Sequence, residues 1–236
     1  MRVATYNVHG FVGTDGVRSV ARVGDVLADL DADVIALQEV DAPGRAEEDG
    51  PLFELATRLG MTPLAGPTIA GPSRMYGNAL LTRWPIARVQ RHDISVSGRE
   101  PRGMLEAWLR PPGGGASLRT LVTHLGLGLR ERRRQIEALS DALATFTDVP
   151  TVVMGDFNEW RPRGLTLLRM NDAMGRAPKA RSWPSRFPLF ALDRIWVRPR
   201  RAIRGIWAVR TPLSRSASDH LPLCLGLDRE RLRPPW

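Results

Sequence analysis

Seven polar side chains that could bind a cation or a phosphate stand at expected strand ends. Five of them follow short apolar segments of the chain, and two follow Ser216-Ala-Ser218. The seven are asparagines, carboxylates and two of the four histidines: Asn7, Glu39, His124, Asp156, Asn158, Asp219 and His220. The apolar segments have the length of strands, and α/β sheets bind ligands beyond the carboxyl ends of their strands. Carboxylate and amide oxygens suit a hard cation such as Mg2+. A zinc cage would need more clustered His or Cys, and the single cysteine, Cys224, lies in an apolar segment.

The apolar residues around these positions predict two strand–helix–strand units. Apolar residues recur at steps of three and four between Val17 and Leu30, which predicts a helix between strands at 2–6 and 33–38. The second unit repeats this order, with strand, helix and strand at 118–123, about 130–146 and 151–155. Both units end their strands at polar residues, so we expect those side chains to occupy equivalent positions.

The rest of the chain indicates further strands and no second domain. Strand patterns at 78–82, 86–94, 104–109 and 117–123 predict a meander, and later strands are expected at 193–197, 203–210 and 221–225. No linker of low complexity divides the sequence. We therefore expect one α/β domain over residues 1–227, followed by a frayed C-terminal tail at 228–236.

Composition excludes several other classes of protein. The 236 residues are 43% hydrophobic and 25% charged, which are ordinary values for a globular protein. The apolar runs are far shorter than the roughly 18 residues that a membrane span needs. One cysteine cannot form an internal disulfide, and residues 1–6 alternate like a strand rather than reading as a secretion signal. We expect a cytoplasmic protein, monomeric and without an obligate protein partner.

Positive charge is concentrated in the last third of the chain. The formal net charge is +9, and residues 160–236 carry +12 whereas residues 1–159 carry −3. A basic face that attracts polyanions is one interpretation, and a merely solvated arginine-rich surface is the other. The charge therefore favours phosphate-bearing partners.

Seven short motifs follow one another along residues 5–221. They are Thr5-Tyr-Asn-Val-His-Gly10, Leu37-Gln-Glu39, Gly77-Asn-Ala-Leu-Leu-Thr-Arg83, Thr123-His-Leu125, Gly155-Asp-Phe-Asn158, Leu192-Asp-Arg-Ile195 and Ser218-Asp-His-Leu221. In this order they resemble the motifs of the endonuclease/exonuclease/phosphatase superfamily, which includes DNase I, exonuclease III and neutral sphingomyelinases. One motif alone is weak, but seven in order are a specific signal. The resemblance implies a four-layer α/β sandwich, with two mixed β-sheets packed face to face and helices outside.

The resemblance also implies a metal site. Glu39 would be the principal ligand of Mg2+, for which Mn2+ could substitute. Asn7 and Asp219 would lie close to the metal and its waters. A carboxylate at the end of an apolar strand is costly unless it is paired or bound to a metal. Of the three residues, Glu39 is therefore the most difficult to interpret as a residue without a function.

The catalytic residues that the resemblance implies come from the later motifs. Asp156 would orient and deprotonate the attacking water, and Asn158 would hold Asp156 and a phosphate oxygen. His220 would donate to the phosphoryl oxygens, with Asp193 holding its ring in orientation. His124 would contact the phosphate from the other side. This division of labour agrees with the need to neutralise an anionic phosphodiester and to place water in line with the bond that breaks.

Three further residues are candidates for binding substrate. Asn78 would lie near His124. His9 stands where many nuclease members of the superfamily have a carboxylate or amide, which weakens an argument for two metals; it would bond a phosphate or a metal-bound water, or shape the turn into Gly10. Arg102, in the loop before the strand at 104–109, is a candidate for an extra phosphate contact.

Substrate identity stays open in the sequence. The basic last third and aromatic residues such as Trp160 and Trp183 favour a nucleic acid, which makes a nuclease the first hypothesis. A lipid-linked or sugar-linked phosphodiester is the alternative, because residues 183–190 mix arginine with apolar side chains that could touch a membrane, and the opening motif resembles that of short bacterial members. A non-catalytic phosphate-binding module is the third hypothesis.

Overall fold

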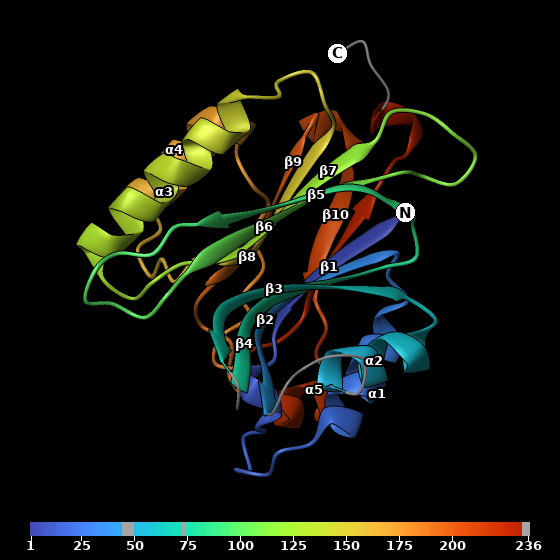
Figure 1. Cartoon of the computed structure of the whole chain (residues 1–236), viewed down its shortest axis with the longest axis vertical. Coiled ribbons are helices and arrows are strands. Elements are labelled where there is room, and N and C mark those ends of the chain that lie inside the picture. The colour runs from blue at the N-terminus through green and yellow to red at the C-terminus, as the bar shows by residue number, and fades with distance from the viewer. Residues whose placement is uncertain (44–49, 72–73, 233–236) are drawn as a thin grey trace.

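Two β-sheets pack face to face, and helices cover the two outer faces of the pair, in the computed structural model of the chain (Figure 1). The structure describes residues 1–43, 50–71 and 74–232. This arrangement confirms the four-layer α/β sandwich with two mixed sheets.

The first sheet has six strands in the order β10-β11-β1-β2-β4-β3. Their bounds are β1 Arg2–Asn7, β2 Val34–Pro43, β3 Thr62–Gly71, β4 Arg74–Thr82, β10 Ile203–Ala208 and β11 Leu223–Leu227. Only the β1 and β2 pair is parallel. The sequence did not predict β3, which contains two prolines and two glycines; its place at the edge of the sheet explains why those residues are tolerated.

The second sheet has five strands in the order β5-β6-β7-β8-β9. Their bounds are β5 Ile86–Asp93, β6 Gly103–Leu109, β7 Leu118–His124, β8 Thr151–Asp156 and β9 Asp193–Arg198. Only β7 and β8 pair in parallel. The expected meander consists of β5, β6 and β7, whereas β4, expected to belong to it, pairs within the first sheet.

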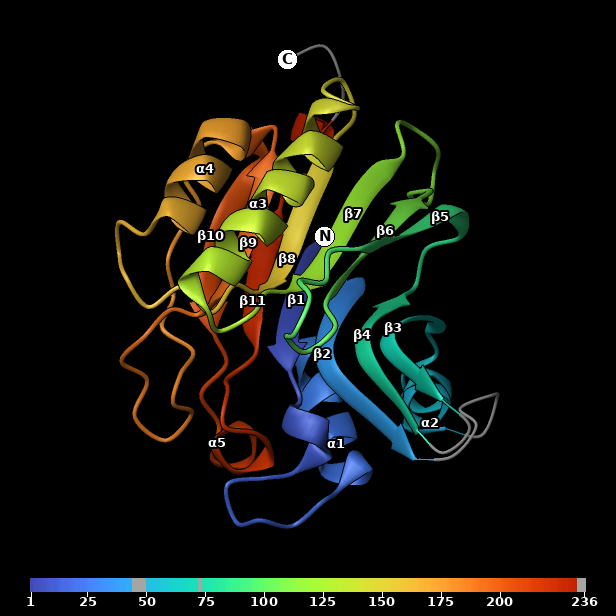
Figure 2. The ribbon, with the colours of Figure 1, turned by 60° about the vertical axis from the view of Figure 1, so that its left-hand side comes forward.

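Helices cover each sheet on its outer side (Figures 1 and 2). The α-helices are α1 Val20–Leu30, α2 Pro51–Leu59, α3 Leu129–Ala144, α4 Leu165–Met174 and α5 Pro212–Ala217. Short 3-10 turns are η1 His9–Phe11, η2 Arg200–Ala202 and η3 Glu230–Leu232. Because α1 connects β1 to β2 and α3 connects β7 to β8, both predicted strand–helix–strand units are confirmed.

The two sheets share an apolar core. Buried side chains of both sheets meet in it, including Val3, Leu80, Val122, Met154 and Ile195. Leu232 joins the same cluster, so the described part of the expected tail packs against the sandwich. No helix of the described residues is long and apolar enough to cross a membrane.

Candidate active site

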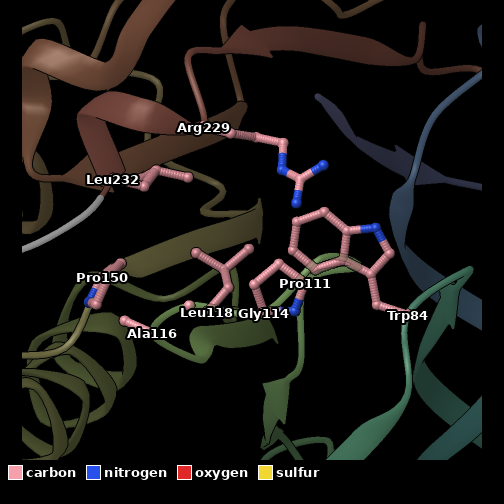
Figure 3. Close-up of a pocket in the computed structure, with 9 residues that line it drawn as sticks. Trp84, Pro111, Gly114, Ala116, Leu118, Pro150, Arg229 and Leu232 are labelled. Carbon is pink, nitrogen blue, oxygen red and sulfur yellow. The ribbon is translucent and has the colours of Figure 1, made fainter.

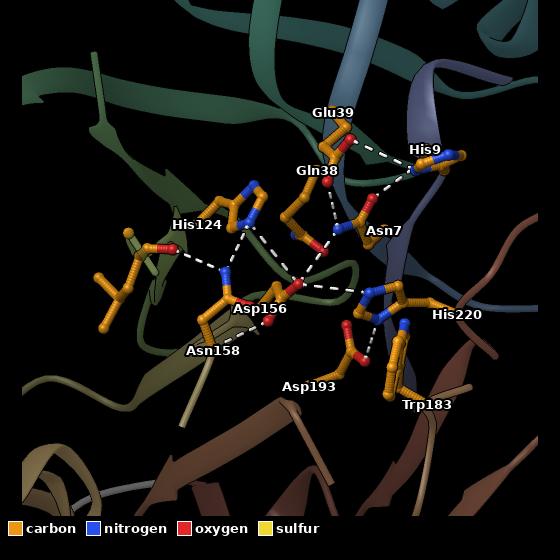
Figure 4. A network of polar contacts seen from close by, with 12 residues as sticks. Asn7, His9, Gln38, Glu39, His124, Asp156, Asn158, Trp183, Asp193 and His220 are labelled. Atoms are coloured by element: carbon orange, nitrogen blue, oxygen red, sulfur yellow. Dashed lines mark hydrogen bonds and ion pairs between the residues drawn. The ribbon is translucent and has the colours of Figure 1, made fainter. Parts of the chain in front are cut away.

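Polar residues at the ends of β1 and β8 meet Glu39 of β2 at one end of the sandwich (Figure 4). The strand expected at 33–38 continues to Pro43, so Glu39 lies within β2 rather than at its end. The Nδ2 of Asn7 donates to the Oε1 of Glu39 at 2.8 Å and to the Oδ2 of Asp156 at 3.1 Å. Asn7 and Glu39 belong to the first sheet and Asp156 to the second. One amide therefore connects the two sheets at the site.

An interruption in β2 places Glu39. The pairing of β2 with β4 shifts register between Leu37 and Val40, and Glu39 has a φ of 57°. Asn158, just after β8, has a φ of 47°. Residues other than glycine rarely adopt this left-handed conformation, and it persists where surrounding structure enforces it, often at functional sites. Two of the predicted site residues are thus held by a constrained backbone.

The open side of the site is rich in oxygen atoms. The side chains of Glu39, Asp219 and His9 are 22%, 37% and 46% exposed. The Nδ1 of His9 lies 3.8 Å from the Oε2 of Glu39 and 3.5 Å from the Oδ1 of Asp219. A carboxylate pair with the amide of Asn7 beside it is the kind of donor set that Mg2+ prefers. His9, expected to bind substrate, lies between two of the predicted metal ligands.

A cleft of about 400 Å3 adjoins these residues. It is lined in part by Glu39, Asp41, Glu100 and His9, and by Arg74, whose Nε donates to the Oδ1 of Asp41 at 2.7 Å. Three carboxylates in one open cleft give it an acidic lining and many hydrogen-bond acceptors.

Asp156 lies at the centre of the buried side of the site. Its carboxylate is 1% exposed, and its Oδ2 lies 3.6 Å from the Nε2 of both His124 and His220. The backbone N–H of Asn158 donates to its Oδ1 at 2.9 Å. Both oxygens of Asp156 are thus held while Oδ2 faces two imidazoles.

His220 and Asp193 form a buried pair. The Nδ1 of His220 lies 2.7 Å from the Oδ2 of Asp193, which also accepts from the hydroxyl of Ser182 at 2.5 Å. Burial lowers the pKa of His220, but the carboxylates of Asp193 and Asp156 outweigh burial and raise the pKa to about 10. His220 is therefore a protonated donor at neutral pH.

The pKa of His124 is shifted in the opposite direction from that of His220. Burial is the main cause that lowers its pKa to about 3, although Asp156 opposes the shift and Arg102 adds to it. The Nη1 of Arg102 lies 3.1 Å from its Nδ1, and the Nδ2 of Asn158 lies 3.0 Å from its Nε2. Because the guanidinium of Arg102 can only donate, Nδ1 must accept and carries no proton, which agrees with a neutral ring. Two histidines on either side of Asp156 thus have opposite charge states.

Two groups of residues could hold a metal. Ligand atoms of Asp156, Asp193 and His220 lie within 4.8 Å of one another. However, the Oδ2 of Asp193 already receives two hydrogen bonds, and all three residues are buried, which leaves little room for the waters that Mg2+ keeps. Glu39 and Asp219 are more open, so the group around Glu39 fits a hydrated cation better.

Asn78 is placed differently from the other candidates. Its Nδ2 donates to the backbone oxygen of Gly103 at 2.9 Å, and no hydrogen bond or ion pair joins it to His124 in the described chain. Arg102, in contrast, lies inside the site, beside His124 and 3.1 Å from the Oε1 of Glu100.

Three supporting residues were missing from the sequence prediction. Ser218 donates to the backbone oxygen of Asn7 at 2.7 Å, Ser182 holds Asp193, and the Nε1 of Trp183 donates to the Oδ2 of Asp219 at 3.1 Å. Ser218 lies within a recognised motif and could have been named. Ser182 and Trp183 belong to a proline-rich loop that gives no such signal.

A second hollow lies at the other end of the sandwich (Figure 3). Its lining is largely apolar, and the guanidinium of Arg229 lies 5.7 Å from the centre of the Trp84 ring. Its volume of about 30 Å3 holds little more than one water. This hollow has neither the carboxylates nor the histidines of the site in Figure 4.

The architecture is a four-layer α/β sandwich, and its polar site lies at one end of the two sheets. A family model described as the Endonuclease/Exonuclease/phosphatase family matches residues 4–220. The chain therefore belongs to the endonuclease/exonuclease/phosphatase family, as its motifs predicted.

Individual relatives agree with this assignment. The chain is 32% identical over 241 residues to the uncharacterized protein YbhP of Escherichia coli K12, which covers 94% of each chain. A mannosyl-6-phosphatase of Bacteroides thetaiotaomicron superimposes with a TM-score of 0.78 at 16% identity, over 97% of this chain and 99% of the other. The catalytic domain of human Nocturnin, with bound sulfate, superimposes with a TM-score of 0.74 at 19% identity, over 95% of this chain and 93% of the other. The two structural likenesses show a shared fold.

Proposed function

We propose that the protein is a divalent-metal-dependent hydrolase of phosphodiesters. The observation that carries the proposal is the position of Asp156, a buried carboxylate 3.6 Å from one protonated and one neutral histidine and bonded to Asn7. Membership of a family of phosphoesterases supports it. A module that only binds phosphate would have no need for this arrangement.

Glu39, Asn7 and Asp219 would hold the metal, with Mg2+ as the proposed ion and Mn2+ as its substitute. Their oxygen donors and partial exposure suit a cation that keeps several waters. When bound, the cation supplies charge neutralisation at the phosphoryl oxygens. The backbone N–H of His9 donates to the Oδ1 of Asn7 at 3.0 Å, which fixes the amide.

Side chains of the protein transfer the protons and bind the phosphoryl group. Asp156 is the carboxylate that accepts the proton of the attacking water. Hydrogen bonds from Asn7 and from the N–H of Asn158 fix its orientation. His220, protonated and held by Asp193, donates toward a phosphoryl oxygen. His124, Asn158 and Arg102 contact the phosphoryl group from the other side. These donors stabilise charge that grows in the transition state.

A polynucleotide substrate remains a prediction from charge. In the structure, much of that charge lies away from the site. β9 begins at Asp193 in the site and ends at Arg198, roughly 17 Å further along the strand. Five more arginines follow near that distant end: Arg200, Arg201, Arg204, Arg229 and Arg231. The +12 of residues 160–236 therefore does not form one surface around the cleft.

A phosphoester with a hydroxylated leaving group is the second candidate, and the acidic cleft favours it. Asp41 is paired with Arg74 and Glu100 with Arg102, and their carboxylate oxygens can still accept hydrogen bonds from the hydroxyls of a leaving group. Sugar-linked and lipid-linked phosphodiesters have such hydroxyls. One structural neighbour is a mannosyl-6-phosphatase, which acts on a phosphorylated sugar.

Hydrolysis of bis-p-nitrophenyl phosphate with Mg2+ or Mn2+ tests the proposal. We expect metal-dependent turnover that Asp156→Ala abolishes. Turnover no higher than that of the Asp156→Ala control would support the binding-module hypothesis instead. A panel of plasmid DNA, abasic DNA, RNA, inositol phosphates and phospholipids then separates the two substrate candidates.

A further inference from the structure

Exposed apolar side chains gather in one part of the molecule. Ten large apolar residues are exposed among those that the structure describes, and six of them lie between residues 160 and 190. Phe187 and Leu189 are 76% and 61% exposed, and Trp160, Leu168 and Phe190 are 40%, 49% and 37% exposed. Single exposed apolar residues are ordinary, but a group of this kind marks an interaction surface.

The loop at 183–190 is held in shape at its base. Trp183 and Phe190 face each other in a β-bridge, and the backbone N–H of Phe190 donates to the oxygen of Trp183 at 2.8 Å. The backbone N–H of Ser185 donates to the oxygen of Asp219 at 2.7 Å. The ring of Trp160 lies 4.9 Å from that of Trp183. Phe187 and Leu189 are therefore presented by an ordered loop.

Two adjoining cavities of about 310 Å3 each lie beside this loop, and both have basic walls. Leu189, Phe190 and Trp160 line the first, and Leu168 lines the second. The two share Lys179 and Arg194, to which the first adds Arg181 and the second adds Arg163 and Arg176. We call these five basic residues, together with the five apolar residues named above, the 160–194 face.

The basic residues of the 160–194 face lack partners. In the described part of the chain, no hydrogen bond or ion pair holds the side chain of Arg163, Arg176, Lys179, Arg181 or Arg194. Arg194 is only 5% exposed, and its buried Nε has no acceptor. The single carboxylate in either wall is Glu159, which faces Arg132 at 3.8 Å. Burial lowers the pKa of Arg194, and the charges of Asp193 and Glu159 oppose that shift without forming an ion pair with Arg194 in the described chain. A buried cation that no carboxylate contacts directly is costly, so the cavities suit an anion.

We propose that the 160–194 face docks the protein on an anionic lipid bilayer. Phosphate groups of the lipid would occupy the basic cavities, while Phe187 and Leu189 would enter the boundary between headgroups and acyl chains. Exposed apolar side chains interleaved with lysine and arginine are what interfacial binding to anionic lipids requires. A nucleic acid would satisfy the cations but offers no apolar region to Leu168, Phe187 and Leu189.

Docking in this manner would bring the active site close to the membrane. Trp183, at the base of the loop, donates to Asp219 on the open side of the site. The inference does not rest on the proposed hydrolysis, because lipid binding requires only the 160–194 face.

Sedimentation of the whole protein with vesicles tests the proposal. We expect binding to phosphatidylcholine vesicles that contain phosphatidylglycerol, and far weaker binding to pure phosphatidylcholine. Lys179→Gln with Arg181→Gln should lower the affinity about 25-fold, at about fivefold for each charge. Phe187→Ser with Leu189→Ser should lower it at least about tenfold. All four residues are exposed, so the variants should fold.

Matched controls remove the same properties elsewhere. Arg83→Gln with Arg204→Gln removes two exposed charges at the other end of the strands, and Trp207→Ser removes exposed aromatic surface beside Arg2. Both should bind vesicles like the wild type. Equal losses in the controls, or equal binding to neutral and anionic vesicles, would overturn the proposal. So would binding of a single-stranded oligonucleotide in place of vesicles, lost with Lys179 and Arg181 but not with Phe187 and Leu189.

A buried variant provides an independent measurement. Arg194→Met removes a buried charge whose Nε has no hydrogen-bond acceptor and keeps a long side chain, so it should raise the melting temperature without lipid while weakening vesicle binding. Lower thermal stability together with unchanged vesicle binding would show that Arg194 has a purely internal role and would remove the cavities from the proposal.

Discussion

Replacing Asp193 by Asn should change the pH dependence of turnover through His220. The variant keeps the shape of the side chain and removes its charge. Asp193 is the largest of the influences that raise the pKa of His220, while burial lowers it. Without that carboxylate, we expect the pKa of His220 to fall from about 10 toward its ordinary value of about 6.5.

The size of the effect follows from this shift. At pH 8, a pKa of about 10 leaves His220 about 99% protonated, and a pKa of about 6.5 leaves it about 3% protonated. If protonated His220 donates to the phosphoryl group, Asp193→Asn should lose about 30-fold in kcat at pH 8. At pH 5.5 about nine tenths of the variant is protonated, so the loss should nearly vanish.

Profiles of kcat against pH with bis-p-nitrophenyl phosphate measure this difference. Histidine NMR titration of the metal-free protein gives the pKa of His220 directly. A ratio of wild-type to variant turnover that stays constant from pH 5.5 to 8, or an unchanged pKa, would refute the reasoning.

A double mutant separates a shared role from independent roles. His220→Ala should cost at least about 100-fold in turnover. Adding Asp193→Asn should then cost little more, because groups that act as a unit are not additive. Fully multiplicative losses would move the partner role from Asp193 to Asp219.

The same pair predicts a dependence of folding stability on pH. The pKa of His220 is raised in the folded state, so the stabilisation from its charge is complete below about pH 6.5 and is lost as pH rises through about 10. In Asp193→Asn this loss between pH 7 and 10 should disappear. Urea unfolding at several pH values measures it, and identical slopes in both proteins would contradict the assignment.

Three further predictions concern metal, charge and the core. Glu39→Gln should keep the fold and weaken Mg2+ binding measured by calorimetry; unchanged affinity and activity would reject Glu39 as a ligand. If the substrate is a polynucleotide, its binding should weaken steeply with salt while turnover of a small phosphodiester changes far less, and a flat salt response would favour the lipid or sugar candidate. Arg119→Leu should lower the free energy of unfolding by about 3–5 kcal/mol, because Arg119 and Glu106 form an ion pair in which both side chains are 1% exposed; a loss below about 1 kcal/mol in urea titration would contradict this.

Much of the fold could be predicted because its signals are local. Apolar periodicity located α1 and α3, and the strands around them, since a helix or a strand must bury one face. Weaker patterns were missed. α4 and α5 are short, and β3 is rich in Pro and Gly, so only packing against the sheet or pairing with β4 specifies them.

The sequence predicted which residues form the site better than it predicted which atoms they contact. The short motifs named Asn7, Glu39, Asp156 and His220, and the structure brings all four together, although His220 follows helix α5 rather than a strand. Asn78, expected near His124, bonds the backbone oxygen of Gly103, which also accepts from the hydroxyl of Thr123 beside His124. Side-chain partners such as Ser182 come from loops, whose paths depend on contacts remote in the sequence.

The sequence by itself determined where the two strand–helix–strand units lie, which polar residues form the site and which family the motifs resemble. These follow from local periodicity and from residue types at fixed spacing. Only the tertiary structure decided that Asn7 bonds Asp156, 149 residues away, and that Ser182 bonds Asp193. It alone showed that the arginines of residues 160–236 lie at different places in the fold, some beside the cavities of the 160–194 face and others near the far end of β9. The reason is that the charge of a histidine depends on its burial, and the position of an arginine depends on how the two sheets pack. Burial and packing are defined only in the folded chain.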